Sequence, residues 1–162
     1  MSNVQNVPFV SSPMSVDARW IAHNGHLNMA YYHVLLDRAF EEFGVVLGLG
    51  SLYIKATQCS LFAAEAHIRY LRELRANDVV RTTIILLAAD DKRLHTVRQL
   101  HHVQYGWIAA MSENMTLHVD LAARKVVSFP DNIQDRLSLI LKRHEAVDRP
   151  DGIGRRVSLQ KQ

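Results

Sequence analysis

The residues best suited to chemistry in this sequence lie between Trp20 and Tyr32, where a polar Asn-Gly-His turn runs directly into an amphipathic segment. A turn of this kind leaves the first backbone N–H groups of a helix without intrahelical acceptors, beside small and polar residues. Free N–H groups at a helix N-terminus polarise a carbonyl group and stabilise the negative charge that develops on its oxygen. The sequence therefore predicts chemistry on a carbonyl group at the front of a buried helix.

The helix that must position these N–H groups is predicted from an apolar stripe. Its members recur at intervals of three and four residues: Tyr32, Leu35, Leu36, Ala39, Phe40 and Phe43. This period is that of one helix face, which we expect to be buried. Asn28 is the expected N-cap, Gly44 is expected to end the helix as its C′ residue, and a glycine-rich connection is expected over 44–51.

The rest of the chain favours strands joined by short turns. Alternating or β-branched residues predict strands over 7–10, 64–71, 79–89, 93–105, 107–121 and 125–129. The polar residues 112–114 are expected to weaken the strand over 107–121. Strands joined by turns as short as Asp90-Asp91-Lys92 are antiparallel neighbours. Helical spacing returns over 131–144. The predicted fold class is α+β, with a long central α-helix wrapped by a curved antiparallel β-sheet.

The composition of the 162 residues is that of a packed protein with a single domain. Apolar residues make up 48% of the chain, which holds only four prolines and seven glycines. The single cysteine, Cys59, allows no intramolecular disulfide, no apolar run reaches membrane-spanning length, and residues 1–15 lack the pattern of a signal peptide. We therefore expect a cytoplasmic protein that has no membrane partner.

Charge gives little further guidance. The net charge is +3, and much of the excess lies near the C-terminus, so we expect a domain over 1–146 and a basic flexible tail over 147–162. A basic balance suits nucleic acid, phospholipid headgroups or a phosphate-bearing molecule such as coenzyme A, and it equally suits a solubilising surface. Charge alone therefore selects no partner.

Four segments together resemble a known family. They are the turn and helix start (Trp20, Asn24, Gly25, His26, Asn28, Tyr31 and Tyr32), Ser60-Leu61-Phe62, residues 65–74, and His118-Val119-Asp120. The pattern resembles the hotdog-fold acyl-CoA thioesterases of the 4-hydroxybenzoyl-CoA thioesterase-like group, and within it the betainyl-CoA thioesterases of carnitine and betaine breakdown. The resemblance implies a hotdog fold, hydrolysis of an acyl-CoA thioester, coenzyme A bound as part of the substrate, no cofactor, and a homodimer or homotetramer.

One position departs from the family pattern. Members carry a carboxylate, usually Asp, three residues before the motif glycine, where it acts as nucleophile or as base for a water; this chain has Ala22 there. A methyl group performs neither role. The resemblance therefore implies hydrolysis impaired at this step. The alternative is a catalytically impaired acyl-CoA-binding protein of the same fold.

The resemblance also implies roles for residues near this position. The backbone N–H of Met29, helped by Gly25, is the implied oxyanion donor. Glu65 is a candidate replacement for the missing carboxylate, because it lies on the polar side of its strand and hotdog active sites form where two subunits meet. The alternative for Glu65 is a solvated or salt-bridged strand residue.

The polar residues of the turn have two interpretations each. Asn24 and Asn28 orient water or cap the helix, and capping is the expected role of Asn28. His26 either orients water or fixes the loop through hydrogen bonds of its ring. His23 is expected to be an exposed loop residue.

Aromatic and basic residues are the candidates for substrate binding. The aromatic candidates are Trp20, Tyr31, Tyr32, Tyr70 and Trp107. Their faces would attract the quaternary ammonium of a betaine-like acyl group, although each also fits an ordinary place in the core. Arg69 and Arg72 would bind the phosphates of coenzyme A, or simply lie on a solvated strand face.

Other kinds of site find little support. The nine histidines form no HExxH or Cys/His cluster, and so we expect no metal site. Ser60, His118 and Asp120 lack the Gly-x-Ser-x-Gly elbow of a serine hydrolase. A nucleic-acid-binding regulator would need a helix-turn-helix segment, and a hotdog dehydratase would need an Asp/His pair; neither is evident. We expect no nucleic-acid partner.

Overall fold

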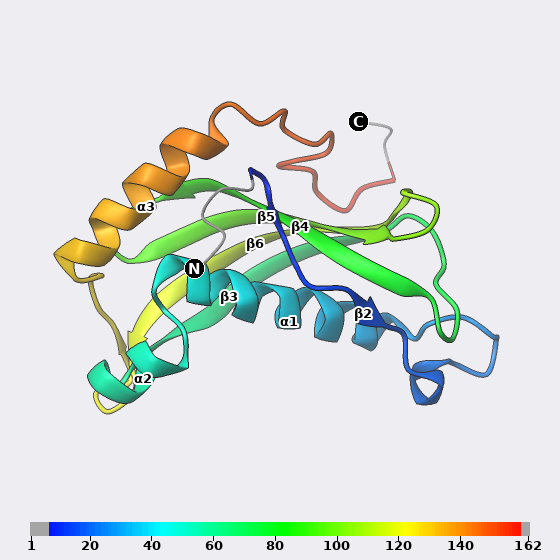
Figure 1. Cartoon of the computed structure of the whole chain (residues 1–162), viewed down its shortest axis with the longest axis horizontal. Coiled ribbons are helices and arrows are strands. Elements are labelled where there is room, and N and C mark those ends of the chain that lie inside the picture. The colour runs from blue at the N-terminus through cyan, green and yellow to red at the C-terminus, as the bar shows by residue number, and fades with distance from the viewer. Residues whose placement is uncertain (1–6, 160–162) are drawn as a thin grey trace.

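Helix α1 (Met29–Leu47) crosses one face of a curved antiparallel sheet, and these two elements carry most of the core (Figure 1). The computed structural model describes residues 7–159. The layout confirms the predicted α+β class, in which the sheet wraps a long central helix.

Helix α1 begins where predicted but ends at Leu47 instead of Phe43. Asn28 is the N-cap, and its Oδ1 accepts a hydrogen bond of 3.0 Å from the N–H of Ala30. The prediction that Gly44 ends the helix was wrong, because Gly44 lies buried inside the helix and Gly48 takes the left-handed conformation at a φ of 81°. Glycine adopts that conformation without the steric cost that a Cβ brings, and so the chain leaves the helix there.

Four long strands form the body of the sheet: β3 (Cys59–Tyr70), β4 (Val79–Ala89), β5 (Arg93–His102) and β6 (Ile108–Asp120), in the order β4-β5-β6-β3. Short strands β1 (Phe9–Val10) and β2 (Met14–Ser15) pair with β4, and β7 (Lys125–Val126) pairs with β6. Every pairing is antiparallel, as predicted. Strand β6 runs without the break predicted at 112–114. Strand β3 forms one edge of the sheet.

Three further helical segments complete the chain. A 3-10 turn, η1 (Ala18–Trp20), precedes the polar turn, and α3 (Asp131–His144) confirms the helix predicted over 131–144. Helix α2 (Ser51–Thr57) was missed, since the sequence analysis saw only a glycine-rich connection before it. The Tyr53 hydroxyl of α2 lies 2.8 Å from Nε2 of the buried His118, whose Nδ1 donates to the Val127 carbonyl at 2.9 Å. His118 therefore fastens α2 to the sheet.

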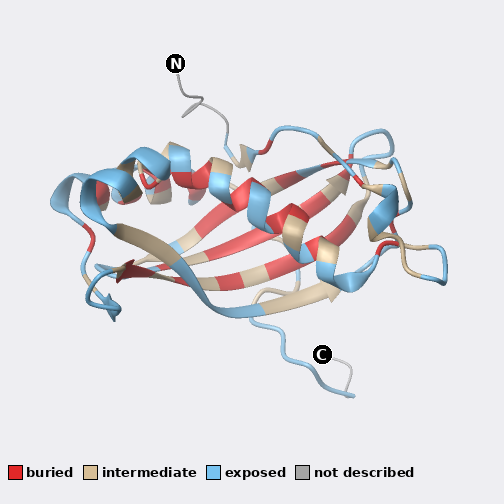
Figure 2. Ribbon diagram, turned by 90° about the horizontal axis from the view of Figure 1, so that it is seen from below, coloured by how far each residue is buried: buried red, intermediate tan, exposed pale blue. Residues whose placement is uncertain are grey.

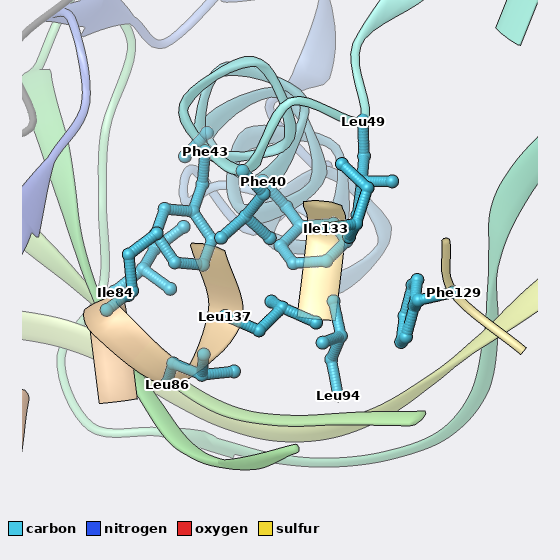
Figure 3. Close-up of a cluster of buried hydrophobic side chains, with 12 residues drawn as sticks. Phe40, Phe43, Leu49, Ile84, Leu86, Leu94, Phe129, Ile133 and Leu137 are labelled. Carbon is cyan, nitrogen blue, oxygen red and sulfur yellow. The ribbon is translucent and has the colours of Figure 1, made fainter. Parts of the chain in front are cut away.

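The predicted apolar stripe of α1 is buried against the sheet. Figure 2 shows α1 lying over strands whose buried residues alternate with more exposed ones. At the C-terminal half of α1, Phe40 and Phe43 meet Ile84 of β4 and Leu137 of α3 (Figure 3). Burial of side chains of this size stabilises the fold by roughly 1.5–3 kcal/mol each. Sheet, α1 and α3 thus share one core.

Helix α3 also covers an open edge of the sheet. Beyond the short strand β1, the backbone N–H of Leu86 in β4 has no strand partner and donates instead to Nδ1 of His144 at 2.8 Å. His144 is buried, and burial lowers the pKa of its ring below the ordinary value. The ring is therefore held neutral, which leaves Nδ1 free to accept the hydrogen bond.

The core contains one charged side chain under α1. Arg98 of β5 is only 5% exposed, and its guanidinium lies 3.8 Å from the centre of the Phe40 ring. Its Nε donates to Thr96 at 3.4 Å, and no carboxylate of the described residues lies within 4 Å. Burial lowers the pKa of Arg98 to about 10, so the group stays charged at neutral pH. On the same face, Asn114 Nδ2 and Thr116 Oγ1 have no partner among residues 7–159.

The first part of the predicted tail lies against the sheet, on the face opposite α1 (Figure 1). Val147 and Ile153 pack on the apolar side chains of this face: Ile85, Val97 and Met111. The N–H of Gly154 donates to Oε2 of Glu113 at 2.6 Å. The flexibility of 147–162 and the domain boundary stay predictions, and residues 160–162 lie outside the described residues.

Replacing Arg98 with methionine is expected to raise the free energy of unfolding by about 1 kcal/mol, because the variant removes a buried charge that has no ionic partner. Methionine keeps the length of the side chain and the contact with Phe40. Urea denaturation followed by circular dichroism measures the change. A clear loss of stability in Arg98→Met would mean that the guanidinium has a stabilising partner.

Acidification is expected to weaken the contact between α3 and β4. The folded pKa of His144 lies below its unfolded value of 6.5, so its contribution to stability is complete above pH 6.5 and is lost as the pH falls through the folded pKa. The urea midpoint should therefore fall between pH 7.5 and pH 5.5. His144→Gln, which accepts a hydrogen bond but does not titrate, should flatten the dependence. His101, whose pKa is also lowered by burial, leaves a residual slope.

Candidate active site at the N-terminus of the central helix

The polar turn before α1 is a tight hairpin closed by its own backbone. The N–H of Ala22 donates to the His26 carbonyl at 2.9 Å, and the N–H of Gly25 donates to the Ala22 carbonyl at 2.9 Å. Gly25 has a φ of 85°, a conformation that glycine adopts readily. The contribution of Ala22 to this turn comes entirely from its backbone. The hydrogen bonds that close the turn therefore do not depend on the side chain at position 22.

The residues after the turn fix where the helix begins. Leu27, which is buried, donates its N–H to the Leu74 carbonyl at 2.7 Å, and Asn28 donates its N–H to the Trp20 carbonyl at 3.0 Å. Asn28 in turn accepts from the N–H groups of Ala30 and Tyr31, each at 3.0 Å. These bonds confirm Asn28 as the helix cap. They attach the first turn of α1 to the connection between β3 and β4.

One N–H at this helix start is left free. The capping bonds satisfy Ala30 and Tyr31, whereas the backbone N–H of Met29 donates to no acceptor among residues 7–159. Helix α1 contains 19 residues, so its dipole places a partial positive charge at this end. The sequence analysis assigned this N–H to a developing oxyanion, and that role stays a prediction. A free N–H at a helix N-terminus can donate a hydrogen bond to a carbonyl oxygen.

A hollow lies at this helix start, with Met29 in its lining. It has a volume of about 390 Å³ and is lined by His26, Leu27, Met29, Tyr32, Tyr70, Leu71, Arg72 and Glu73. The His26 ring lies at its wall with Nδ1 3.1 Å from the Leu27 carbonyl. A carbonyl only accepts, so Nδ1 is the donor in this contact. The contact agrees with a ring that fixes the loop, and the role of His26 in orienting water stays a prediction.

Two tyrosines form the back of this hollow. The buried Tyr32 hydroxyl accepts from the N–H of Leu74 at 3.2 Å, and burial raises the pKa of Tyr32. The rings of Tyr32 and Tyr70 meet edge to face at 5.2 Å. The Tyr70 hydroxyl lies 3.5 Å from Nε2 of His33. Tyr32 is thus a core residue with one face at the site, as its place in the apolar stripe predicted.

The other substrate-binding candidates fall into separate groups. Trp20 and Tyr31 stack on each other at 5.0 Å, with Arg38 5.2 Å from the centre of the Trp20 ring. Arg72 and Trp107 lie far apart in the sequence, but the guanidinium of Arg72 lies 4.6 Å from the centre of the Trp107 ring. The described chain therefore contains no single cage that gathers all the predicted aromatics.

Glu65 and Arg69 lie on the face of β3 that is turned away from α1. Glu65 pairs with Met115 and Arg69 with Met111, and Arg69 donates to the Asp151 carbonyl of the tail at 3.4 Å. A bulge between Ala63 and Glu65 sets which side chains of β3 face the helix. Within one chain these two residues do not line the hollow in front of Met29. Their predicted roles stay predictions.

The remaining polar residues of the turn, His23 and Asn24, are exposed and do not line this hollow. The sequence analysis missed Leu71 and Glu73, which lie in the hollow because the β3–β4 connection passes the helix start. Among the described residues, no three His, Cys, Asp or Glu side chains lie together as a metal ion requires.

The helix and sheet, with a free N–H where the helix starts beside the hollow, define the class of the protein as the hotdog fold. The model of the thioesterase-like superfamily matches residues 16–137. The chain belongs to this superfamily, and the predicted family and fold are thereby confirmed. Within the described residues, no helix has both the length and the apolar character that crossing a membrane requires.

Relatives with known names are similar over most of this chain. The betainyl-CoA thioesterase of Pseudomonas aeruginosa is 33% identical over 144 residues, covering 86% of this chain and 88% of that protein. The L-carnitine dehydrogenase/betainyl-CoA thioesterase of Rhizobium meliloti is 35% identical over 142 residues, which span 88% of this chain but 28% of that protein. A Staphylococcus aureus protein solved in complex with CoA matches with a TM-score of 0.85 and 25% identity, over 94% of this chain and 95% of its own.

Proposed function

We propose that the protein hydrolyses an acyl-CoA thioester to the free acid and CoA, with the thioester carbonyl bound in front of α1. The free N–H of Met29, at the end of a buried helix and at the wall of a hollow, is the observation that carries the proposal. A thioester carbonyl oxygen placed there accepts one hydrogen bond and gains from the helix dipole. The superfamily and the CoA complex of the S. aureus protein support the substrate class.

In this proposal, His26 supplies the base that Ala22 does not. A water in the hollow attacks the carbonyl carbon and gives a proton to Nε2 of His26, a residue of the lining whose Nδ1 stays bonded to the Leu27 carbonyl. The C–S bond of the resulting tetrahedral intermediate breaks, and the CoA thiolate takes the proton from His26, which becomes a base again. The reaction is a hydrolysis and needs no cofactor. Compared with relatives that carry a carboxylate at position 22, turnover is expected to be slow.

A betainyl group is the proposed acyl group, on the strength of the relatives' names. Its quaternary ammonium suits an aromatic face, and Tyr70 supplies an exposed one beside Met29. The second candidate function is an acyl-CoA-binding protein without turnover. The methyl group of Ala22 is the observation that favours it, since binding groups are retained where the family's catalytic group is absent.

We further propose that two copies associate through β3. This strand pairs with β6 on one side only, and a run of its residues, 62–66, is exposed. An unpaired strand edge of this length is a template for a second chain. Association of two β3 strands would also bring Glu65 of one copy toward the other. A homodimer is therefore the smallest assembly expected.

The chemistry is tested by comparing this chain with Ala22→Asp on betainyl-, acetyl- and benzoyl-CoA. The Asp variant is expected to raise kcat by about 10²-fold or more, because it restores a base beside the bound thioester. Ala22→Asn, which has the same shape without the charge, should leave kcat unchanged. His26→Gln should lower the residual rate of the chain as it stands by about 10²-fold and have a smaller effect in the Asp variant.

The outcomes separate the two candidate functions. Equal turnover by the chain and its Asp variant, both insensitive to His26→Gln, would assign the chemistry to another group, and Glu65→Gln would be tested next. If neither chain hydrolyses a thioester while both bind CoA esters, the protein is a binding protein. The acyl group with the highest kcat/KM identifies the substrate.

The assembly is tested by light scattering after gel filtration. We expect a mass that is a multiple of two chains of 18.4 kDa. The double variant Ala64→Glu and Ala66→Glu should shift the mass to one chain, since it places like charges on the exposed edge of both copies. Ala123→Glu, in the exposed turn before β7, is the matched control. A wild-type protein with the mass of one chain would contradict the proposal.

A further inference from the structure

A second hollow lies at the end of the sheet, beside the candidate active site. It has a volume of about 490 Å³ and is lined by Arg72, Glu73, Arg75, Asp78, His102, Tyr105 and Trp107. Arg72 and Glu73 also line the hollow in front of Met29, so the two hollows share a wall. A substrate whose thioester lies at Met29 therefore has a continuous path over Arg72 to the second hollow.

The second hollow presents aromatic faces at the end of that path. The ring of His102 lies 4.7 Å from the ring of Tyr105 and 4.7 Å from that of Trp107. Tyr105 is 66% exposed. Trp107 is partly exposed and His102 is buried behind the two larger rings. Aromatic rings at a surface bind a nucleobase by stacking, since every base has a π face. This chemistry differs from that of the first hollow, where a backbone donor and a histidine meet.

Among the described residues that line the second hollow, Arg72 is an arginine without an acidic partner. Glu73 is paired with Arg75 at 2.9 Å, and the hydrogen-bonded Arg75 guanidinium lowers the pKa of the Glu73 carboxyl. Asp78 accepts from the backbone N–H of Arg75 at 2.8 Å and lies 3.5 Å from Nε2 of His102. Arg72 has no carboxylate within 4 Å among residues 7–159, and its contact is the Trp107 ring.

We infer that this hollow binds the nucleotide end of the CoA substrate. The adenine ring stacks on Trp107 and Tyr105, and Arg72 moves from the Trp107 ring to a phosphate oxygen. A guanidinium binds phosphate through paired N–H groups, which a neutral aromatic face does not match. The guanidinium of Arg72 thus lies on the ring face where the base is proposed to stack, and it becomes the phosphate ligand when the substrate binds. The inference rests on the proposed function, since it assigns the non-reacting end of the same substrate.

A quaternary ammonium group is the competing occupant of these rings. It would have to displace Arg72 from Trp107 and would then lie beside a repelling guanidinium. Arg72 and Trp107 therefore predict opposite changes in affinity for a nucleotide and for a quaternary ammonium. Removing the charge of Arg72 should weaken binding of a phosphate-bearing nucleotide and strengthen binding of a betaine.

The test is calorimetric titration of the full chain with adenosine 3′,5′-bisphosphate, a probe that carries neither thioester nor acyl group. Arg72→Gln and Tyr105→Ala should each weaken binding at least about fivefold, by loss of a phosphate contact and of a stacking ring. Arg93→Gln, which removes an exposed arginine from the β4–β5 turn, should leave binding unchanged. Tyr105 is largely exposed, so its replacement keeps the fold, and thermal melting verifies this.

A kinetic comparison separates this inference from the proposed function. In the Ala22→Asp background, Arg72→Gln and Tyr105→Ala should raise KM for the CoA thioester. Tyr105 does not line the hollow at Met29, so Tyr105→Ala should leave KM for the N-acetylcysteamine thioester of the same acyl group unchanged. If the bisphosphate does not bind, or binds equally to all variants, the inference is overturned. The proposed hydrolysis is not affected by that outcome. Tighter binding of glycine betaine to Arg72→Gln, without bisphosphate binding, overturns it in favour of an acyl site. Bisphosphate binding by a chain that hydrolyses no thioester supports nucleotide binding in the second hollow and contradicts the proposed hydrolase function.

Discussion

The packing of α1 against the sheet is the constraint on which the rest of the structure depends. The apolar stripe from Tyr32 to Leu47 is buried along nearly the whole helix, so the helix has neither freedom to rotate nor freedom to slide. Its first turn is held by backbone bonds from Leu27 to Leu74 and from Asn28 to Trp20. The free N–H of Met29 is therefore fixed in direction before any substrate binds. Stabilisation by preorganised donors needs this kind of rigidity, because a donor that must reorient loses much of its effect.

Local sequence patterns predicted the helices and strands whose structure depends mainly on residues close together in the sequence. The stripe of α1, the cap at Asn28 and the strand from Val79 to Ala89 follow from side-chain period and turn chemistry within a few residues. The end of α1 was missed because two glycines competed: Gly44 had the composition of a stop, but the stripe continued to Leu47. Strand β6 was expected to weaken at Ser112 and Asn114, two polar residues that face the helix. These residues lie beside the buried Arg98, a polar neighbour that no local pattern reveals.

The same distinction applies to the site. The proposed reactive end could be located from the sequence, because the turn from Ala22 to His26 and the start of α1 are contiguous in it. The pairing of Arg72 with Trp107 depends on where the β3–β4 and β5–β6 connections meet, and sequence spacing does not encode that distance. Glu65 shows the effect of a single bulge, since one extra residue in β3 decides which alternate side chains face the helix. Residues of this kind are placed by sheet register, a property of the whole fold.

The structure also explains how the fold tolerates Ala22, because the turn uses the backbone of this residue and not its side chain. Ala22 closes the turn through its N–H and its carbonyl, and neither bond involves its side chain. The hollow, the free N–H of Met29 and the fixed ring of His26 are all made by neighbouring residues. Loss of a carboxylate at this position therefore costs no part of the architecture, only the group that would activate the nucleophile. In the proposed function, a chain without this carboxylate hydrolyses a thioester slowly and keeps the groups that are proposed to bind it.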